Sequence, residues 1–233
     1  MNIKTLITGA ALIAASATTN AAVYFGEDLG WYTSNTSTNA DAAFAGFQAA
    51  LINVGVEDFE SFSNGASAPL LVDFGVAGTA TLTGGDQVTN GNYPGGPSRR
   101  AHSGVNYWET NTSSFTINFS QSIAAFGFYG IDIGDFNGQV TLNTSGGSAS
   151  TYNIPHSQGS VANGSLLYWG VIDTANTFTS ITFSNTGSGA DFFGFDDFTI
   201  GSVQQVRPVP APAAVALFGL GLAGLGMSRR RKA

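Results

Sequence analysis

The chain has 233 residues, 15 acidic and eight basic side chains, a formal net charge of −7 and no cysteine. Five of the basic residues lie within the first four or the last five positions, so the rest of the chain holds three arginines against fifteen acids, a net charge of −12. Such a surface repels phosphates, which excludes nucleic acid as a partner. Without cysteine no disulfide can form, so packing or a bound metal must stabilise the fold.

The N-terminus has the three regions of a secretory signal. Lys4 supplies a positive charge, residues 6–17 are apolar and almost uncharged, and small residues at 19–22 offer a cleavage point after Ala21 or Ala22. We therefore predict that residues 1–22 form a signal-peptide helix, that signal peptidase removes it and that the chain is exported.

One segment after the signal has a helical pattern. Phe44, Phe47 and Leu51 recur at three- and four-residue spacing, and Gly55 follows as a stop signal. The spacing predicts one short helix at about residues 41–53.

Most of the remaining chain alternates apolar and polar residues, which is typical of half-buried strands. Phe115, Ile117 and Phe119 alternate with polar residues, and Val76, Ala80 and Leu82 continue the pattern elsewhere. Further strands are predicted at 56–59, 125–131, 139–142, 151–154, 166–171, 181–184 and 192–200. Many short strands separated by Gly-, Asn- and Asp-rich turns favour two packed antiparallel sheets. We predict an all-β fold over residues 23–206, a jelly-roll-like antiparallel β-sandwich.

The polar stretch 86–103 is predicted to be a long loop. It contains Arg99 and Arg100, the only paired cations of the body, and Trp108 follows closely. A guanidinium fork beside an aromatic floor is suited to a sugar or a carboxylate. These three residues are therefore our candidate ligand contacts, and an exposed loop kept soluble by its arginines is the alternative. Other aromatics suited to a sugar platform are Trp31, Tyr32, Tyr93, Tyr107, Tyr168 and Trp169.

Catalytic patterns are weak in this sequence. His102 and His156 stand among turn residues, and no zinc-protease, nucleophile-elbow or phosphate-loop motif occurs. Carboxylate pairs for glycoside cleavage remain open, since only spatial separation defines them; the candidates are Glu57, Asp58, Glu60 or Glu109 with Asp132 or Asp135. We predict no catalytic residue and a protein that is not an enzyme.

Acidic residues cluster near the first and the last predicted strands. In the last strand Phe193 and Phe195 share one face and Phe198 and Ile200 the other, so we predict a β-bulge at the two aspartates between them. First and last strands of a sandwich are often neighbours, which would bring residues 57–60 to this bulge. Crowded carboxylate oxygens favour Ca²⁺.

These two acidic segments resemble those of jelly-roll carbohydrate-binding modules, in which matching acids hold a structural calcium. The resemblance rests on Phe59-Glu60 and on Phe195-Asp196-Asp197-Phe198. It implies Glu60 and Asp196 as calcium ligands, with Asp58 and Asp197 as secondary candidates. The alternative is that the aspartates cap a turn and Glu60 is solvated.

The C-terminus has three parts in a fixed order. Val209, Pro210, Ala211 and Pro212 precede an uncharged run at 213–227, and four cations follow it. At about 1.5 Å per residue this run is slightly short of a bilayer core of roughly 30 Å. We predict a membrane-spanning helix at about 212–228 whose basic end, residues 229–232, lies in the cytoplasm.

This tail resembles the PEP-CTERM family of sorting signals in its VPxP variant. The residues that carry the resemblance are Val209, Pro210, Ala211, Pro212, Arg229, Arg230 and Arg231. It implies an exosortase as the processing partner, transient anchoring in the inner membrane of a Gram-negative bacterium, and a body released or attached at the cell surface. Residues 207–233 are thus the sorting tail of the predicted domain plan.

The leading functional hypothesis is a non-catalytic extracellular protein that binds or embeds in exopolysaccharide. The alternatives are a matrix-glycan hydrolase and a structural, adhesive or ice-binding surface protein. Ice binding would need a flat, threonine-ordered face, and the threonines are scattered singly along the chain.

Overall fold

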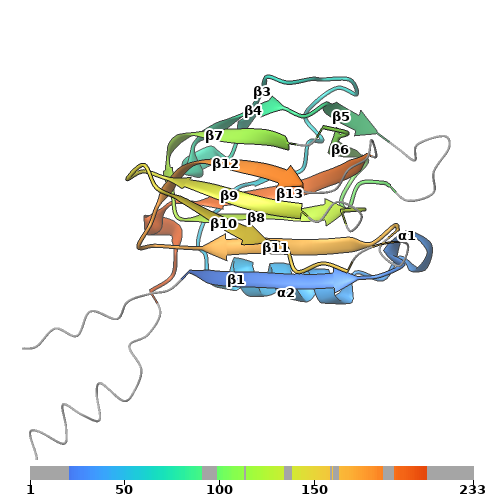
Figure 1. The fold of residues 1–233 in the computed structure, drawn as a ribbon, viewed down its shortest axis with the longest axis horizontal. Helices are drawn as coiled ribbons and strands as arrows, with labels where there is room; N and C mark the ends of the chain where they lie inside the picture. Colours follow the sequence, from blue (N-terminus) through green and yellow to red (C-terminus); the bar gives the residue numbers. More distant parts are fainter. Residues whose placement is uncertain are drawn as a thin grey trace, which may run out of the picture.

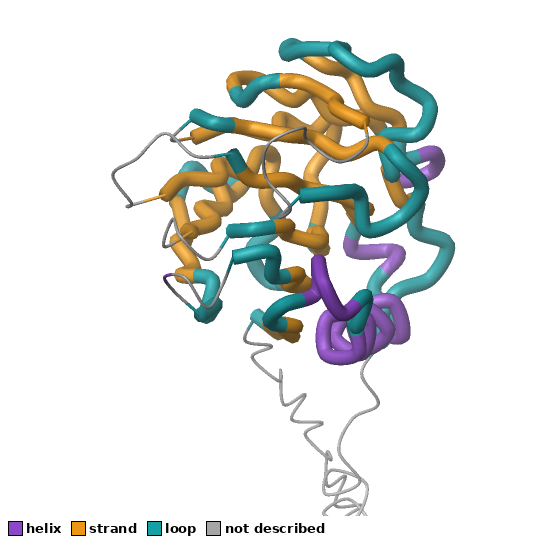
Figure 2. Tube along the Cα trace, turned by 90° about the vertical axis from the view of Figure 1, so that its right-hand side faces the viewer, coloured by secondary structure: helices purple, strands orange, loops and turns teal. Residues whose placement is uncertain are grey.

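The computed structural model describes residues 21–90, 99–112, 114–133, 138–157, 159, 163–185 and 192–208. Two antiparallel sheets face each other in this part of the chain, and one helix packs outside the first sheet (Figures 1 and 2). This confirms the predicted all-β sandwich. Residues 1–20 of the predicted signal peptide and the whole predicted tail helix lie outside the described residues, whereas Ala22, the last residue of the predicted signal, begins a strand. No helix among the described residues is long and apolar enough to cross a bilayer.

The first sheet has seven strands and the second has six. The order of the first is β1 (Ala22–Asp28), β11 (Leu166–Ile172), β8 (Ala125–Ile131), β13 (Phe193–Gly201), β6 (Asn106–Thr110) and β5 (Gln87–Asn90), with β2 (Val56–Glu57) paired to β13. The order of the second is β10 (Ala149–Asn153), β9 (Gly138–Thr144), β12 (Phe178–Asn185), β7 (Ser114–Ile123), β4 (Thr79–Gly84) and β3 (Leu70–Asp73).

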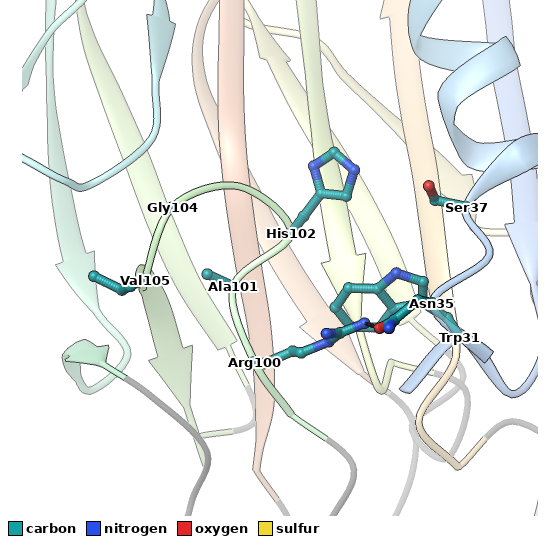
Figure 3. Close-up of a pocket in the computed structure, with 8 residues that line it drawn as sticks. All are labelled: Trp31, Asn35, Ser37, Arg100, Ala101, His102, Gly104 and Val105. Carbon is teal, nitrogen blue, oxygen red and sulfur yellow. Dashed lines mark hydrogen bonds between the residues drawn. The ribbon is translucent and has the colours of Figure 1, made fainter. Parts of the chain in front are cut away.

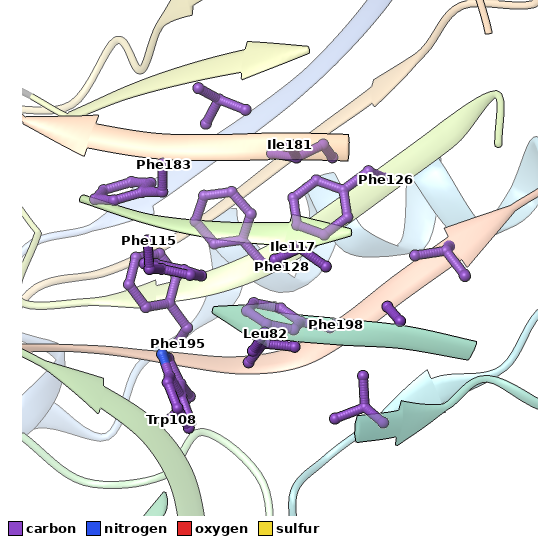
Figure 4. Packing of buried hydrophobic residues seen from close by; sticks show 14 of the residues in the cluster. Leu82, Trp108, Phe115, Ile117, Phe126, Phe128, Ile181, Phe183, Phe195 and Phe198 are labelled. Atoms are coloured by element: carbon purple, nitrogen blue, oxygen red, sulfur yellow. The ribbon is translucent and has the colours of Figure 1, made fainter. Parts of the chain in front are cut away.

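Phenylalanines fill the space between the sheets. Phe115 and Phe183 project from the second sheet and meet Phe128 and Phe195 of the first, and Phe198 packs beside these two (Figure 4). Each such ring contributes roughly 1.5–3 kcal/mol by leaving water, and edge-to-face pairs add to this. The alternation seen in the sequence is therefore the alternation between this core and solvent. Val76 was wrongly included in it, because it lies in the short 3₁₀ turn η1 (Gly75–Ala77) and is 79% exposed.

The predicted β-bulge is present in β13. The register between β13 and β8 shifts between Asp196 and Thr199, and Asp197 has a φ of 49°. Because of this extra residue Phe195 and Phe198 both reach the core, while Asp196 and Asp197 bond to residues over the outer face of the first sheet. The predicted neighbourhood of the two acidic segments is also confirmed, since Glu57 of β2 pairs with Phe198 of β13.

Two helices lie near the β1 edge of the first sheet. The predicted helix is α2 (Thr38–Ala49), which packs on β1 and β11, and a short α1 (Trp31–Ser34) precedes it. Helix α2 starts three residues earlier than predicted because the carboxylate of Asp28 accepts the N–H groups of Asn39 (2.9 Å) and Ala40 (2.8 Å) in its first turn. Another 3₁₀ turn, η3 (Val203–Gln205), follows β13.

Candidate functional site

Residues 99–105 cross the outer face of the first sheet and are fixed there by two carboxylates. Asp196 accepts the N–H groups of His102 (2.8 Å) and Ser103 (3.0 Å), and Glu60 accepts those of Val105 (2.7 Å) and Asn106 (2.5 Å). The segment therefore has a defined position over the sheet, which its polar sequence did not predict.

Arg99 anchors the start of this segment in the protein interior. Its Nε lies 3.2 Å from Glu109 Oε1, and its Nη1 donates to the carbonyl of Phe192 at 2.8 Å. Burial raises the pKa of Glu109, and the charge of Arg99 only partly opposes this; burial and the Glu109 charge also raise the pKa of Tyr107. Arg99 is thus a buried anchor, and its predicted role as a ligand contact is wrong.

Arg100, the next residue, lines a pocket of about 390 Å³. Its guanidinium carbon lies 4.3 Å from the centre of the Trp31 ring, and its Nη2 donates to Asn35 Oδ1 (Figure 3). Among the described residues Arg100 forms no ion pair, and its Nε is buried without a hydrogen-bond partner. The described lining residues are Trp31, Asn35, Ser37, Arg100, Ala101, His102, Gly104 and Val105.

His102 forms a second wall of this pocket. Its ring stacks on Tyr129 with 3.7 Å between ring centres, Nδ1 lies 2.8 Å from Asp197 Oδ2, and Nε2 lies 3.2 Å from Asp41 Oδ1. Burial acts to raise the pKa of Asp41, but hydrogen bonds from Ser37, Tyr129 and His102, with the His102 charge, outweigh it and lower that pKa. Both ring nitrogens are thus engaged by carboxylates of the protein itself.

Trp108 does not belong to this pocket, so its prediction as a ligand contact is wrong. It is fully buried and lies in the core, where its ring is 6.4 Å from that of Phe59 (Figure 4). Along β6 the side chains of Tyr107 and Glu109 point to the outer face, so Trp108 between them points inward. Trp31, one of the other aromatics proposed as a sugar platform, is the tryptophan that lines the pocket.

Two of the predicted calcium ligands, Asp196 and Glu60, bind the same backbone segment, but the four predicted acids do not form a cage. Asp196 and Glu60 accept backbone N–H groups of the 102–106 segment, Asp197 accepts from Ser103 Oγ at 2.7 Å, and Asp58 accepts the Glu60 N–H at 3.1 Å. Burial and the Asp197 charge raise the pKa of Asp196 well above its usual range. Within the described ranges no group of three or more His, Cys, Asp or Glu side chains could hold a metal ion. These residues do not fit the calcium site that the sequence suggested.

The candidate hydrolytic carboxylates also have protein partners. Glu57 accepts the Phe59 N–H at 2.7 Å, and burial raises its pKa; Asp132 accepts the Gly164 N–H at 2.8 Å. Asp135 lies outside the described residues. None of the candidate acids is among the described residues that line the pocket.

A second feature is a row of threonines on the outer face of the second sheet. Five adjacent strands each contribute one threonine, and each threonine is paired in register with the threonine of the neighbouring strand. The side-chain oxygens are 2.9 Å apart between Thr141 and Thr151 and 3.1 Å apart between Thr116 and Thr182. In strand order the row is Thr151, Thr141, Thr182, Thr116 and Thr83. The sequence did not show it because the row runs across strands rather than along one.

Residues 208–232 match the PEP-CTERM protein-sorting motif, which confirms the family to which the tail was compared. The match includes the predicted 209–212 motif and the basic end, and it marks an exported protein sorted to the cell surface. No curated protein sequence matches the chain.

Several solved structures are similar to parts of the sandwich. The K2 cleaved adhesin domain of Lys-gingipain is 16% identical, with a TM-score of 0.37, and the match covers 63% of this chain and 97% of that one. TmCBM61 in complex with β-1,4-galactotriose is 19% identical over 62% and 94% of the two chains, with a TM-score of 0.33. A variant of a family 29 carbohydrate-binding module is 15% identical over 67% and 97%, with a TM-score of 0.34.

Proposed function

We propose that this PEP-CTERM-sorted surface protein is a non-catalytic protein that binds polysaccharide of the extracellular matrix. The observation that carries the proposal is the pocket in which the Arg100 guanidinium lies on the Trp31 ring beside the Asn35 amide. Sugar sites use a few polar groups held in fixed orientations, and here the Trp31 ring, only 3% exposed, supports the Arg100 guanidinium from beneath while Asn35 fixes its Nη2 end.

The proposed route to the surface follows from the two ends of the chain. Signal peptidase removes residues 1–22, and an exosortase processes the tail while its apolar run sits in the inner membrane of a Gram-negative cell with the basic end in the cytoplasm. The folded body then faces the matrix, either released or attached.

Retention on immobilised matrix polysaccharides tests the proposal. The purified exported protein is expected to bind without releasing sugar, and Arg100→Ala and Trp31→Ala are each expected to weaken binding about tenfold or more. Arg207→Ala is the control, because Arg207 is an exposed arginine that lies outside the pocket, where its Nε donates to the Leu51 carbonyl, whereas Arg100 is half-buried in the pocket wall. Unchanged binding by both pocket variants would refute the assignment of the pocket, and released sugar would favour the hydrolase.

The threonine row favours a second candidate function, adhesion to an ordered hydroxylated surface such as ice. A second row of uncharged polar residues lies beside the threonine row on the outer face of the second sheet. In strand order it consists of Asn143, Ser180, Asn118 and Thr81. An ice-recrystallisation assay separates the two functions: Thr182→Lys, at the centre of the row, should abolish an activity that the exposed Thr36→Lys control keeps. An inactive wild-type protein removes this candidate.

A further inference from the structure

We propose that the pocket binds the carboxylate of an acidic polysaccharide, a polyuronate, rather than a neutral glycan. This inference rests on the polysaccharide-binding function proposed above and adds the chemical class of the ligand. Its basis is the charge and the unused hydrogen-bonding capacity of the groups that line the pocket.

The first argument concerns the charge of Arg100. The folded body carries three arginines against fifteen acids. Arg99 is paired with Glu109 in the interior, whereas Arg100 lines the pocket and forms no ion pair among the described residues. Because Arg100 has no carboxylate partner although the protein is so acidic, the carboxylate of a ligand can form the ion pair with it.

The second argument concerns which hydrogen bonds remain to be made. The oxygen of Asn35 already accepts from Arg100 Nη2, so its amide N–H₂ is the part of that side chain left for a ligand. Arg100 Nε is buried without a partner, and Nη1 forms no hydrogen bond with the described residues, so the N–H groups of Nη1 are donors left for a ligand. Both ring nitrogens of His102 are occupied. The pocket therefore offers mainly donors, and a carboxylate, which only accepts, satisfies them better than hydroxyl groups.

The third argument is that the neighbouring acids do not face the ligand position. Asp41 is held by Ser37, Tyr129 and His102, and Asp197 is held by His102 and Ser103. Asp196 and Glu60 are turned to backbone N–H groups. None of these four acids is among the described lining residues, so no carboxylate of this group occupies the wall of the pocket beside Arg100.

The orientation of the guanidinium adds selectivity. Trp31 supports the face of the Arg100 guanidinium at 4.3 Å, so the group makes its hydrogen bonds in its own plane. Nη2 already donates one N–H to Asn35 and Nε is buried, so the Nη1/Nη2 end of the fork is the part left for a ligand. A planar fork held in this way suits bidentate pairing with a carboxylate, which a lysine cannot reproduce. A uronate methyl ester keeps the sugar backbone but loses the charge and one acceptor oxygen, so it isolates this contact.

Binding to three polymers tests the inference: polygalacturonate, its methyl ester and polyglutamate, measured with the purified exported protein and with Arg100→Gln, Arg100→Lys and the Arg207→Gln control. We expect polygalacturonate to bind at least tenfold more tightly than its ester, Arg100→Gln to remove that preference, Arg100→Lys to recover part of it, and Arg207→Gln to keep it. Thermal melting of each variant checks that it is folded.

The outcomes separate the two proposals. Equal binding of the acid and the ester, or an acid preference that survives in a folded Arg100→Gln variant, overturns the polyuronate inference while polysaccharide binding stands. Equally tight binding of polyglutamate also overturns it, because the protein then recognises carboxylates without regard to the sugar. If polygalacturonate, its methyl ester and other neutral glycans all fail to bind, the proposed function itself is overturned.

Discussion

Two neighbouring tyrosines on the outer face of the first sheet should respond in opposite ways to loss of the hydroxyl group. Their rings are 5.1 Å apart, in an edge-to-face arrangement. The Tyr129 hydroxyl donates to Asp41 Oδ1 at 2.9 Å, whereas the Tyr168 hydroxyl is buried and has no hydrogen-bond partner in the described structure. We therefore expect Tyr129→Phe to destabilise the protein and Tyr168→Phe to leave it equally or more stable.

The magnitudes follow from the partners of each hydroxyl. A hydrogen bond to a charged group contributes about 1.5–3 kcal/mol, and because the Asp41 side chain is 50% exposed we expect only about 1 kcal/mol for Tyr129→Phe. Removing the buried, unsatisfied Tyr168 hydroxyl should change the free energy of unfolding by between zero and about 1 kcal/mol in the stabilising direction.

The effect of pH adds a second readout. The pKa of Asp41 is lowered in the folded protein, so its contribution to stability is present above the usual value of 3.8 and is lost as the pH falls through the folded pKa. The cost of Tyr129→Phe should therefore shrink at low pH as Asp41 takes up a proton, while the effect of Tyr168→Phe should not change.

Urea unfolding of the wild-type protein and both variants, at pH 7 and at about pH 2.5, measures these differences. If Tyr129→Phe were no less stable than Tyr168→Phe at pH 7, the hydrogen-bond network around Asp41 and His102 would be refuted.

The remaining predictions concern the segment over the sheet and the absent cage. Gly104→Ala should lower the free energy of unfolding by about 2 kcal/mol, because Gly104 has a φ of +58° and an added Cβ would lie 2.4 Å from the Glu60 carboxyl carbon. The control is Gly147→Ala, which has a φ of +81° and open space around it and should therefore cost only the backbone strain. Equal losses of stability in thermal melts of the two variants would contradict the close approach of Gly104 to Glu60. The melting temperature should be the same in millimolar calcium and in chelator, since Glu60 and Asp196 already accept backbone N–H groups; a rise of several degrees with calcium would restore the predicted metal site.

Alternation of apolar and polar residues was enough to predict strands such as β7 and β12, because one face of each meets the core and the other meets solvent. It failed for β6, whose five residues are all buried, one face under the 99–105 segment and the other in the core. The same fact explains the error at Trp108, since a strand covered on both faces does not show which side chains point outward.

The bulge in β13 was predictable because a bulge leaves its mark within one strand, as a shift in the apolar phase. The pocket was only half predictable. Arg100 stood out as a rare cation, but its partner Trp31 comes from α1, and His102 acquires its surroundings from Asp41 of α2 and Asp197 of β13. Such contacts depend on the order of strands in the sheet, which local sequence patterns do not encode.

Tryptophan fluorescence tests the central claim, that the Trp31–Arg100 pocket is the polysaccharide site. All three tryptophans of the chain are buried, but Trp31 lines the pocket beneath Arg100 whereas Trp108 and Trp169 lie in the core between the sheets, so a ligand that moves Arg100 should change the emission of Trp31 alone. In titrations of the exported protein with polygalacturonate we predict a saturable change that disappears in Trp31→Phe and shifts to at least tenfold higher concentration in Arg100→Gln. Saturable binding detected by calorimetry in both variants at wild-type affinity would contradict the claim.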